Sequence, residues 1–190
     1  MNMAEKYSIL DLQTLLDAVH AGERLKFLFF WGHHPNVDGN IGKGCLSQWW
    51  PAAFTGDGIT YPTAEHFMMA EKARLFGDDV ALQEILNASS PGTAKSVGRG
   101  VQGFEDAIWS DRRFAIVVRG NQAKFAQNPP LKEFLRNTGN RVLVEASPQD
   151  RIWGIGLAED DARVTNPEQW LGLNLLGFAL MKVRSLLEGT

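Results

Sequence analysis

Apolar side chains recur at helical spacing in several short segments of this chain. In residues 9–20, Leu12, Leu15 and Val19 share one face, and Ser8 is a candidate N-cap. Helical segments are also predicted over 63–76, over 79–87, from Pro91 after Ser90, from Ser110 to about residue 126, from Pro129 after a capping Asn128 to about Gly139, and over 174–187. The pattern therefore predicts a mainly helical protein.

Shorter apolar runs predict a few strands between these helices. The aromatic run "LKFLFFW" and the run "RVLVEAS" are typical of buried strands, and "FTGDGITYP" predicts a hairpin with a tight turn at Gly-Asp-Gly. Residues 32–45 and 148–157 are rich in glycine and polar residues, which favours loops. We expect an α+β fold in which helices dominate a small sheet, with an N-terminal helical extension over residues 1–25 and one domain over residues 26–190.

The segment "YPTAEHFMMAEKARLF", residues 61–76, has two charges on its apolar side. With Glu65 at 0° on a helical wheel, Lys72 falls at about 340°, between Met68 at about 300° and Met69 at about 40°. The other two charges of its middle, in "EKAR", fall at about 240° and about 180° and are expected to be solvated. Glu65 and Lys72 lie roughly 10 Å apart along the axis, so both could reach one bound molecule. The structural alternative is that Lys72 extends past the methionines and Glu65 serves only as a first-turn charge.

Composition limits the classes of function. A chain of 190 residues with 44% hydrophobic and 22% charged residues suits one globular domain. The net charge of −3 and the pI near 5.8 do not support duplex binding by charge alone. Cys45 is the single cysteine, residues 1–10 lack a basic-then-apolar leader, and no apolar run reaches the ~20 residues of a bilayer span. We expect a cytoplasmic protein with no membrane contact.

Motifs for metal or acyl-transfer chemistry are not evident. His33 and His34 are adjacent, which is a poor spacing for a shared metal ion, and Cys45 has no base near it in sequence. The run "DGNIGKG" is too short between its glycines for a phosphate-binding P-loop. We expect neither a metal nor a cofactor.

Tryptophans supply candidate stacking surfaces. Trp31 and Trp50 are expected in the core, whereas Trp109 and Trp153 stand beside turn or loop residues and are better placed to stack on a flat ring. Asp150 precedes Trp153 and could present a carboxylate there, although capping the following turn is the preferred interpretation.

Four motifs in order resemble the NADAR family, also called YbiA-like. They are "YPTAEHFMMAEKARLF", "WSDRRFAIVVRGNQAKFAQNPPLKEFLRNTG", "LVEASPQDRIWGIGL" and "NLLGFALMKVR", and the resemblance covers about residues 26–187. The chain departs from the family where "EHFMMAEK" replaces "EHYFQAQK" and where Gln48 follows Ser47 in place of asparagine. These departures bear on the substrate more than on the chemistry.

The resemblance implies an N-glycosidase that breaks the bond between C1 of a phosphorylated ribose and a nitrogen. One implied substrate is ADP-ribosylated guanine in DNA or other nucleic acid; the other is an early riboflavin-pathway intermediate, which would release ribose 5-phosphate. The carried-over catalytic residues are Glu65, Lys72 and Asp150. The resemblance also carries over Trp109 and Trp153, as substrate-binding residues. To this substrate-binding set we add as candidates Ser47, Trp49, Arg99, Arg112, Arg113, Gly154 and Gly156, the two glycines because they allow close backbone approach.

The implied roles follow from the bond that breaks. Loss of a nitrogen leaving group makes C1 cationic, which calls for an acid/base group, and Glu65 is the candidate. A lysine on an apolar surface favours its neutral amine, so Lys72 is the candidate for a Schiff base with ring-opened ribose. Asp150 would bind a ribose hydroxyl or orient water, and a basic residue such as Lys124 or one of the arginines would hold phosphate. A non-catalytic ADP-ribose-binding module and a structural protein with incidental helix charges are the alternatives, and the oligomeric state is open.

Overall fold

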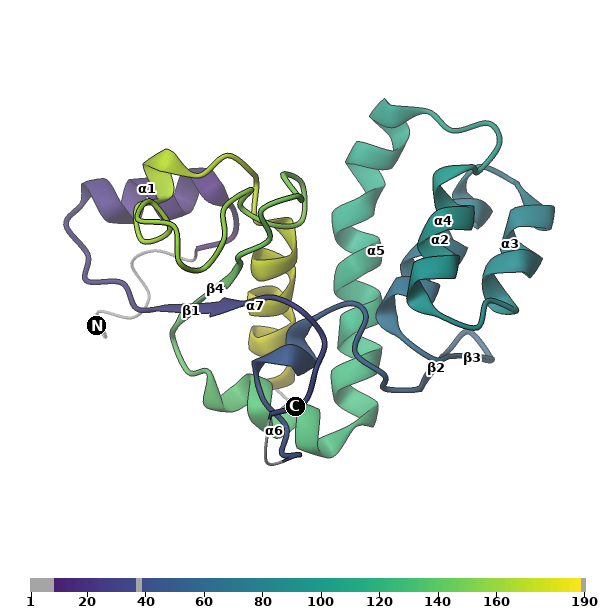
Figure 1. Ribbon diagram of the computed structural model, residues 1–190, viewed down its shortest axis with the longest axis horizontal. Coiled ribbons are helices and arrows are strands. Elements are labelled where there is room, and N and C mark those ends of the chain that lie inside the picture. The colour runs from purple at the N-terminus through teal and green to yellow at the C-terminus, as the bar shows by residue number, and fades with distance from the viewer. Residues whose placement is uncertain (1–8, 37–38, 189–190) are drawn as a thin grey trace. The chain divides into compact units, whose positions relative to one another are not determined.

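The architecture has two compact parts. A computed structural model describes residues 9–36 and 39–188. Unit 1 combines the chain up to Trp31 with the chain from Phe134 onward, and unit 2 is Gly32–Glu133. Most of the regular structure is helical, and the described residues form two sheets of two strands each (Figure 1). The predicted α+β class with dominant helices agrees with this arrangement.

Unit 2 is built around helix α2, Ala64–Leu75. It also contains the 3-10 helix η2 (Lys43–Leu46), strands β2 (Phe54–Gly56) and β3 (Ile59–Tyr61), and helices α3 (Asp79–Leu86), α4 (Pro91–Arg99) and α5 (Asp106–Gln127). Helix α2 packs against α3, α4 and α5, which lie around it in Figure 1. It is therefore buried on most of its circumference rather than on one stripe, unlike a surface helix.

Two glycines allow the close approach of helices to α2. A Cβ on Gly98 of α4 would lie 2.2 Å from the Met69 sulfur, and one on Gly120 of α5 would lie 2.5 Å from Cδ1 of Phe67. Both positions are glycine because a larger residue would overlap the side chains of α2.

Local signals fix the starts of α2 and α4 and the turn between β2 and β3 as the sequence predicts. Ser90 caps α4 through its side chain, with Pro91 in the first turn, and Thr63 caps α2 in the same way. Strands β2 and β3 pair antiparallel across Asp57 and Gly58, which both have positive φ as a two-residue hairpin turn requires.

Unit 1 contains helix α1 (Leu12–His20), strands β1 (Phe27–Phe30) and β4 (Val142–Glu145), the 3-10 helix η3 (Pro167–Gln169) and helix α7 (Leu175–Glu188), while α6 (Pro129–Asn137) leads into it. Strands β1 and β4 are parallel, with Phe27 opposite Val142. Asn174 ties α7 to β4, because its side chain accepts a hydrogen bond from the amide of Glu145 at 3.0 Å and donates one to the carbonyl of Leu143 at 2.9 Å. This side chain extends the hydrogen bonding of the strand to the helix that covers it.

Two predictions about tryptophans are wrong. Helix α5 begins at Asp106, so Trp109 lies in its first turn and is buried, not beside a loop. The expected start at Ser110 fails because residues 106–109 already continue the helix and Ser110 faces solvent within it. Trp31, expected in the core, is 61% exposed because it stands just beyond the end of β1, whereas Trp50 is buried as predicted.

Other ends differ in smaller ways. The predicted cap Ser8 lies outside the described residues, and Asp11 caps α1 in a reciprocal arrangement with Thr14. The side chain of Asn128 donates to the carbonyls of Lys124 and Ala53 and so serves the end of α5, while its backbone carbonyl accepts from the amides of Leu131 and Lys132 at the start of α6. No helix among residues 9–36 and 39–188 is long and apolar enough to cross a bilayer.

Candidate functional site

The first turn of α2 is held by a hydrogen-bonded histidine. The Nδ1 atom of His66 lies 2.8 Å from the Thr63 hydroxyl, and its Nε2 lies 3.1 Å from the carbonyl oxygen of Ala88. Since a carbonyl can only accept, Nε2 carries the proton and Nδ1 accepts from Thr63. Burial lowers the pKa of His66, which keeps the ring neutral in this role. This histidine is a structural group and not a metal ligand.

Glu65 lies next to that capping histidine and is 2% exposed. Its backbone amide donates to the carbonyl of Gln48 at 3.0 Å, which fixes the start of α2 against the segment that follows η2. The wheel placed Glu65 on the apolar side of its helix, and the structure confirms that placement. A carboxyl this deeply buried is a candidate for proton transfer, because buried ionisable groups are concentrated at functional sites.

Lys72 occupies the same helix two turns later and is 8% exposed. Its Nζ donates to the carbonyl of Gly98 at 2.7 Å and lies 4.2 Å from the ring centroid of Phe104 and 5.7 Å from that of Trp109. Burial lowers the pKa of this amine. The structure therefore brings Lys72 and Trp109 together, and it adds Phe104, which the sequence analysis did not identify.

Phe104 gives no periodic signal because it lies in the loop between α4 and α5. An exposed aromatic residue after a glycine in "VQGFED" was the available hint, and only the fold shows which side chain it meets.

The segment from Cys45 to Gln48 is fixed from α5. Lys124, fully buried, donates to the carbonyls of Cys45 and Ser47 at 2.7 and 2.8 Å, and Asn121 donates to the side-chain oxygen of Gln48 at 2.7 Å. The prediction that Lys124 holds phosphate is wrong, because its amine is engaged with backbone inside the protein. On a wheel for α5, Lys124 falls about 60° from Trp109, on the buried arc, so the pattern could have revealed this.

Ser47 and Trp49, both in the candidate substrate-binding set, stand at the end of that segment. The hydroxyl oxygen of Ser47 accepts from the amide of Trp49 at 3.1 Å. The ring of Trp49 is half-buried and has His33 at 5.6 Å and the amine of Lys95 at 5.8 Å from its centroid. Trp49 is therefore an accessible aromatic surface beside positive charge.

The arginines of the candidate substrate-binding set lie in three environments. Arg99 and Arg112 are exposed, and Arg112 pairs with Asp111 at 3.0 Å. Arg113 is half-buried, and its buried Nε has no hydrogen-bond partner among the described residues. Of the three, Arg113 is the one whose position leaves a buried donor available to a ligand.

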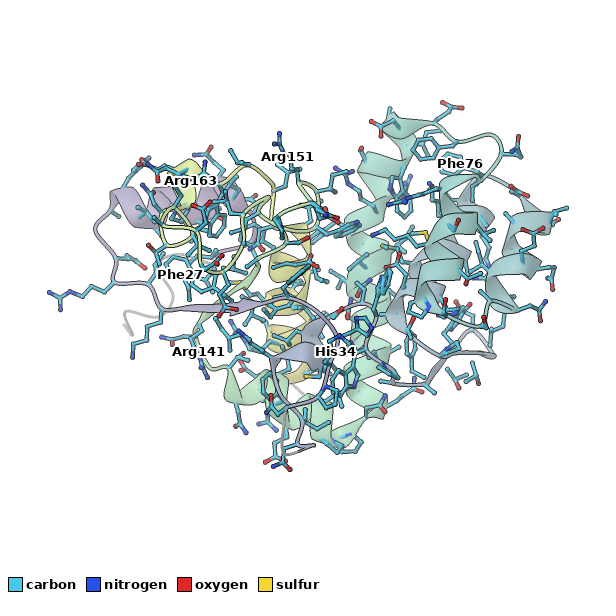
Figure 2. All side chains as sticks on the ribbon, viewed as in Figure 1. Phe27, His34, Phe76, Arg141, Arg151 and Arg163 are labelled. Carbon is cyan, nitrogen blue, oxygen red and sulfur yellow. The ribbon has the colours of Figure 1, made fainter. Side chains whose placement is uncertain are left out.

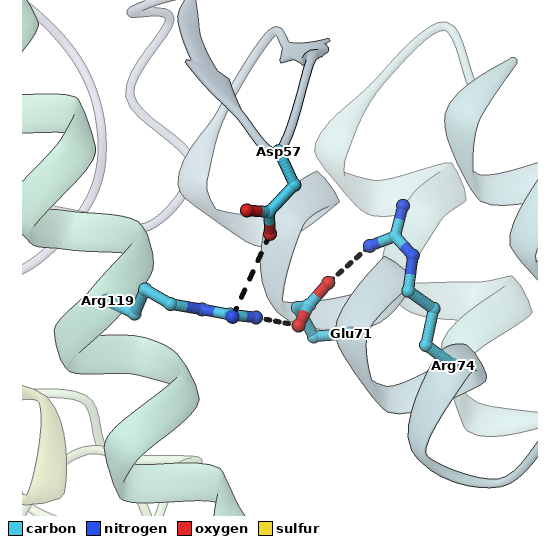
Figure 3. Close-up of polar contacts among 4 residues, drawn as sticks. All are labelled: Asp57, Glu71, Arg74 and Arg119. Carbon is cyan, nitrogen blue, oxygen red and sulfur yellow. Dashed lines mark hydrogen bonds and ion pairs between the residues drawn. The ribbon is translucent and has the colours of Figure 1, made fainter.

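The outer face of α2 carries an ion-pair cluster. Glu71 pairs with Arg74 and Arg119, and Arg119 also reaches Asp57 at 3.8 Å (Figure 3). The side chain of Glu71 is only 12% exposed, so the expectation that it is solvated is wrong. The neighbouring helix α5 supplies the covering arginine, which a wheel for α2 alone could not show.

Asp150, Trp153, Gly154 and Gly156 lie in unit 1, on the loop after β4. One carboxylate oxygen of Asp150 accepts from the amides of Ile152 and Trp153 at 2.9 and 2.8 Å, which confirms the capping interpretation. Trp153 is half-buried.

The two glycines of this loop have structural reasons. A Cβ on Gly154 would lie 2.8 Å from the carbonyl oxygen of Glu145, so the chain's own backbone fills the space beside it. Gly156 has a φ of +69°, which favours glycine. Their part in substrate binding stays a prediction.

Comparison with known proteins decides the family. A family model for the NADAR domain matches residues 29–188. The chain belongs to the NADAR family. Among its relatives, "N-glycosidase R617" of Acanthamoeba polyphaga mimivirus is 43% identical over 84% of this chain and 95% of that protein. "N-glycosidase YbiA" of Escherichia coli (strain K12) is 32% identical over 73% of this chain and 76% of its own length.

The family also includes relatives with riboflavin names and a solved structure. "Riboflavin biosynthesis protein PYRR, chloroplastic" of Zea mays is 37% identical over 71% of this chain but only 21% of that protein. The NMR structure of E. coli YbiA superposes with a TM-score of 0.67 at 26% identity, over 87% of each chain. The resemblance to NADAR proteins and the α+β fold are thereby confirmed, while the domain boundary at residue 26 and the roles of the site residues stay predictions.

Proposed function

We propose that this NADAR protein is an N-glycosidase that hydrolyses the bond between C1 of a phosphorylated ribose and a nitrogen. The names of R617 and YbiA support the reaction class. The observation that carries the mechanism is the Lys72 amine, which is buried beside two aromatic rings on the same helix as the buried Glu65. An ordinary surface lysine would be held protonated by water and could not attack carbon.

The reaction runs in three steps that consume one water. The glycosidic nitrogen expels the ring oxygen, which takes a proton, and leaves an open-chain iminium at C1. The neutral amine of Lys72 then adds to C1, and the nitrogen base departs with a proton, leaving a C1=Nζ Schiff base. Water adds to C1, the C1–Nζ bond breaks, and the ribose leaves as an aldehyde while the amine is restored. Glu65 carries the protons between these steps.

The environment of the two groups suits these steps. Burial lowers the pKa of Lys72, which raises the neutral fraction that can act as a nucleophile. Glu65 lies seven residues earlier, roughly 10 Å along the helix axis, so a substrate spanning two turns can meet both groups.

The leading substrate is ADP-ribosylated guanine in DNA. The family resemblance supports it, and the half-buried ring of Trp49, beside the amine of Lys95, offers an aromatic surface to one of its bases. Arg113 has a buried Nε to offer to the diphosphate. For Asp150 the family resemblance implies a contact with a ribose hydroxyl, in addition to its place as the cap of its own turn.

A riboflavin-pathway intermediate is the second candidate substrate. The maize relative and "Riboflavin biosynthesis protein VVA0006" of Vibrio vulnificus, which is 34% identical over 76% of this chain, carry riboflavin names. Both substrates contain a phosphorylated ribose joined at C1 to nitrogen, so the same Lys72 chemistry applies to either.

The test is to incubate the protein with an oligonucleotide carrying one ADP-ribosylated guanine and, separately, with the phosphoribosylated pyrimidine amine. Mass spectrometry identifies the products from wild type, from Lys72→Ala and from the control Lys132→Ala, whose lysine lies on α6. We expect wild type and Lys132→Ala to cleave the C1–N bond, which frees the oligonucleotide from ADP-ribose or the pyrimidine amine from ribose 5-phosphate. Lys72→Ala should fold normally and cleave at least about 10²-fold more slowly.

Each outcome decides between the proposed function and one alternative. Full activity in Lys72→Ala removes the Schiff-base mechanism. Cleavage of the pyrimidine amine alone makes the riboflavin intermediate the substrate. ADP-ribose binding without any cleavage makes the protein a binding module.

A further inference from the structure

Phe104 lies directly over the Lys72 amine although it belongs to a loop. Its ring centroid is 4.2 Å from Nζ, closer than that of Trp109 at 5.7 Å. The Phe104 side chain is 42% exposed, while Lys72 is 8% exposed. The exposed ring therefore stands between the buried amine and solvent.

The loop is anchored on one side of this ring. The amide of Gln102 donates to the Asp78 carboxylate at 2.8 Å, and Val101 is buried. Gly103 follows with a φ of +69°, which turns the chain so that Phe104 faces back toward α2. Phe104 also meets Phe76, labelled in Figure 2, edge to face at 5.3 Å.

Nζ has few polar neighbours. It donates to the carbonyl of Gly98, and no ion pair to it exists within the described part of the chain. The lowered pKa of Lys72 has desolvation as its cause, without a charge partner. The charged and titratable side chains on α2 and the elements packed against it are Glu65, His66, Glu71, Arg74, Tyr61, Asp78, Asp79, Glu84, Lys95, Arg99, Glu105, Asp106, Asp111, Arg112, Arg113, Arg119 and Lys124.

We propose that Phe104 is a positioning residue for Lys72: its ring shields the amine from water in the free protein and moves aside to admit the carbon that the amine attacks. The movement is required because bond formation brings C1 within about 3–3.5 Å of Nζ, on a side that the ring occupies. The catalytic use of this shield rests on the proposed function, but the shielding itself does not.

Two effects of the ring on the charge of Lys72 oppose each other. The ring face stabilises the ammonium by a cation–π interaction, whereas the exclusion of water disfavours it. Burial lowers the pKa of Lys72, and the Phe104 ring is part of the cover that buries it, so in our proposal the exclusion of water by the ring exceeds its attraction. Removing the ring therefore raises the pKa toward its ordinary value and at the same time opens access to the amine.

The test measures the amine without using the enzyme's reaction. Wild type and Phe104→Ala are exposed briefly to formaldehyde and sodium cyanoborohydride between pH 6 and 10, and dimethylation of Lys72 is quantified by peptide mass spectrometry against Lys132. We expect the two pH profiles to cross. Phe104→Ala labels more slowly on the acid side, tenfold for each unit by which the pKa rises, and faster on the alkaline side, where access limits the rate.

Two further variants separate shielding from general loosening. Phe104→Tyr keeps a ring and should retain the wild-type profile. Phe76→Leu removes a ring that contacts Phe104 but not Nζ. Its pH profile should not cross that of wild type. Superimposed profiles for wild type and Phe104→Ala, or an equal change in Phe76→Leu, would overturn the proposal. Because labelling needs no substrate, a crossing profile in a protein that cleaves neither substrate would retain the shield and reject the N-glycosidase.

Discussion

Lys124 is a charged residue whose burial gives it a single structural task. The amine donates to two backbone carbonyls, and burial lowers its pKa to about 7. In the unfolded chain the same amine has its ordinary value of 10.5. Between these two values the unfolded state binds more protons, so folding becomes more favourable as pH rises. Below about pH 7 the amine is protonated in the folded state as well, so the full cost of burying its charge is present there.

This linkage gives a prediction for Lys124→Met. From pH 7 to pH 9 the free energy of unfolding of wild type should rise by about 2 kcal/mol relative to the variant, measured by urea denaturation at each pH. The window stops at pH 9 because burial raises the pKa of the Cys45 thiol to about 12 from 9.0, which removes stability at higher pH. Parallel pH dependence in both proteins would show that the Lys124 amine titrates normally.

At the scale of elements, glycines on α4 and α5 determine how closely these helices pack against α2. Gly120 meets the Phe67 ring, which is itself packed against Tyr61 at 5.1 Å and Phe54 at 5.9 Å. Gly98 meets Met69, an unbranched side chain that can change rotamer. The two crossings therefore resist an added methyl group to different degrees.

Alanine substitutions measure that difference. An alanine inside a helix is ordinarily about 1 kcal/mol more stable than a glycine. Gly120→Ala should instead destabilise the protein by about 1–3 kcal/mol, and Gly98→Ala should destabilise it less, because Met69 can move. Gly92→Ala is the control, since its Cβ would meet Trp49 at an ordinary 3.5 Å. Equal free energies of unfolding for the Gly98 and Gly120 variants would contradict this account.

The sequence was sufficient for elements that carry their own end signals. Ser90 before Pro91, and Asp57 before Gly58, define a helix start and a hairpin turn by local chemistry alone. The start of α5 lacks a side-chain cap at Glu105, so the sequence offers no signal there and favours a start near Ser110 instead. The parallel pairing of β1 with β4 joins segments more than a hundred residues apart, which no local pattern specifies.

The candidate site was predictable to the same extent. Glu65 and Lys72 were found because a charge on an apolar arc of one helix is visible in its own period. The cover over Lys72 comes from a loop, and the partners of Glu71 come from another helix, so neither follows from the pattern of α2 (Figure 3). Packing between elements supplies what periodicity cannot.

At the scale of the whole molecule, the open point is whether residues 1–25 are a detachable extension. Helix α1, the described helix within them, packs as part of unit 1. Leu15 and Ala18 are fully buried, and His20 lies 2.7 Å from the carboxylate of Glu168 in η3. A segment that buries apolar side chains in this way contributes to the fold that it contacts.

Leu15→Ala tests this point without removing any chain. It should lower the free energy of unfolding by about 2–4 kcal/mol, because the side chain is fully enclosed, whereas the 49% exposed Leu10 should tolerate alanine within about 0.5 kcal/mol. A chain that starts at residue 26 should then melt lower than the full chain, by about 2–4 °C for each kcal/mol lost. If Leu15→Ala and the shortened chain both melt with the wild type, residues 1–25 are an extension and the domain begins near residue 26. If both melt lower, α1 belongs to the folded domain, and the boundary that the sequence predicts at residue 26 lies instead before α1.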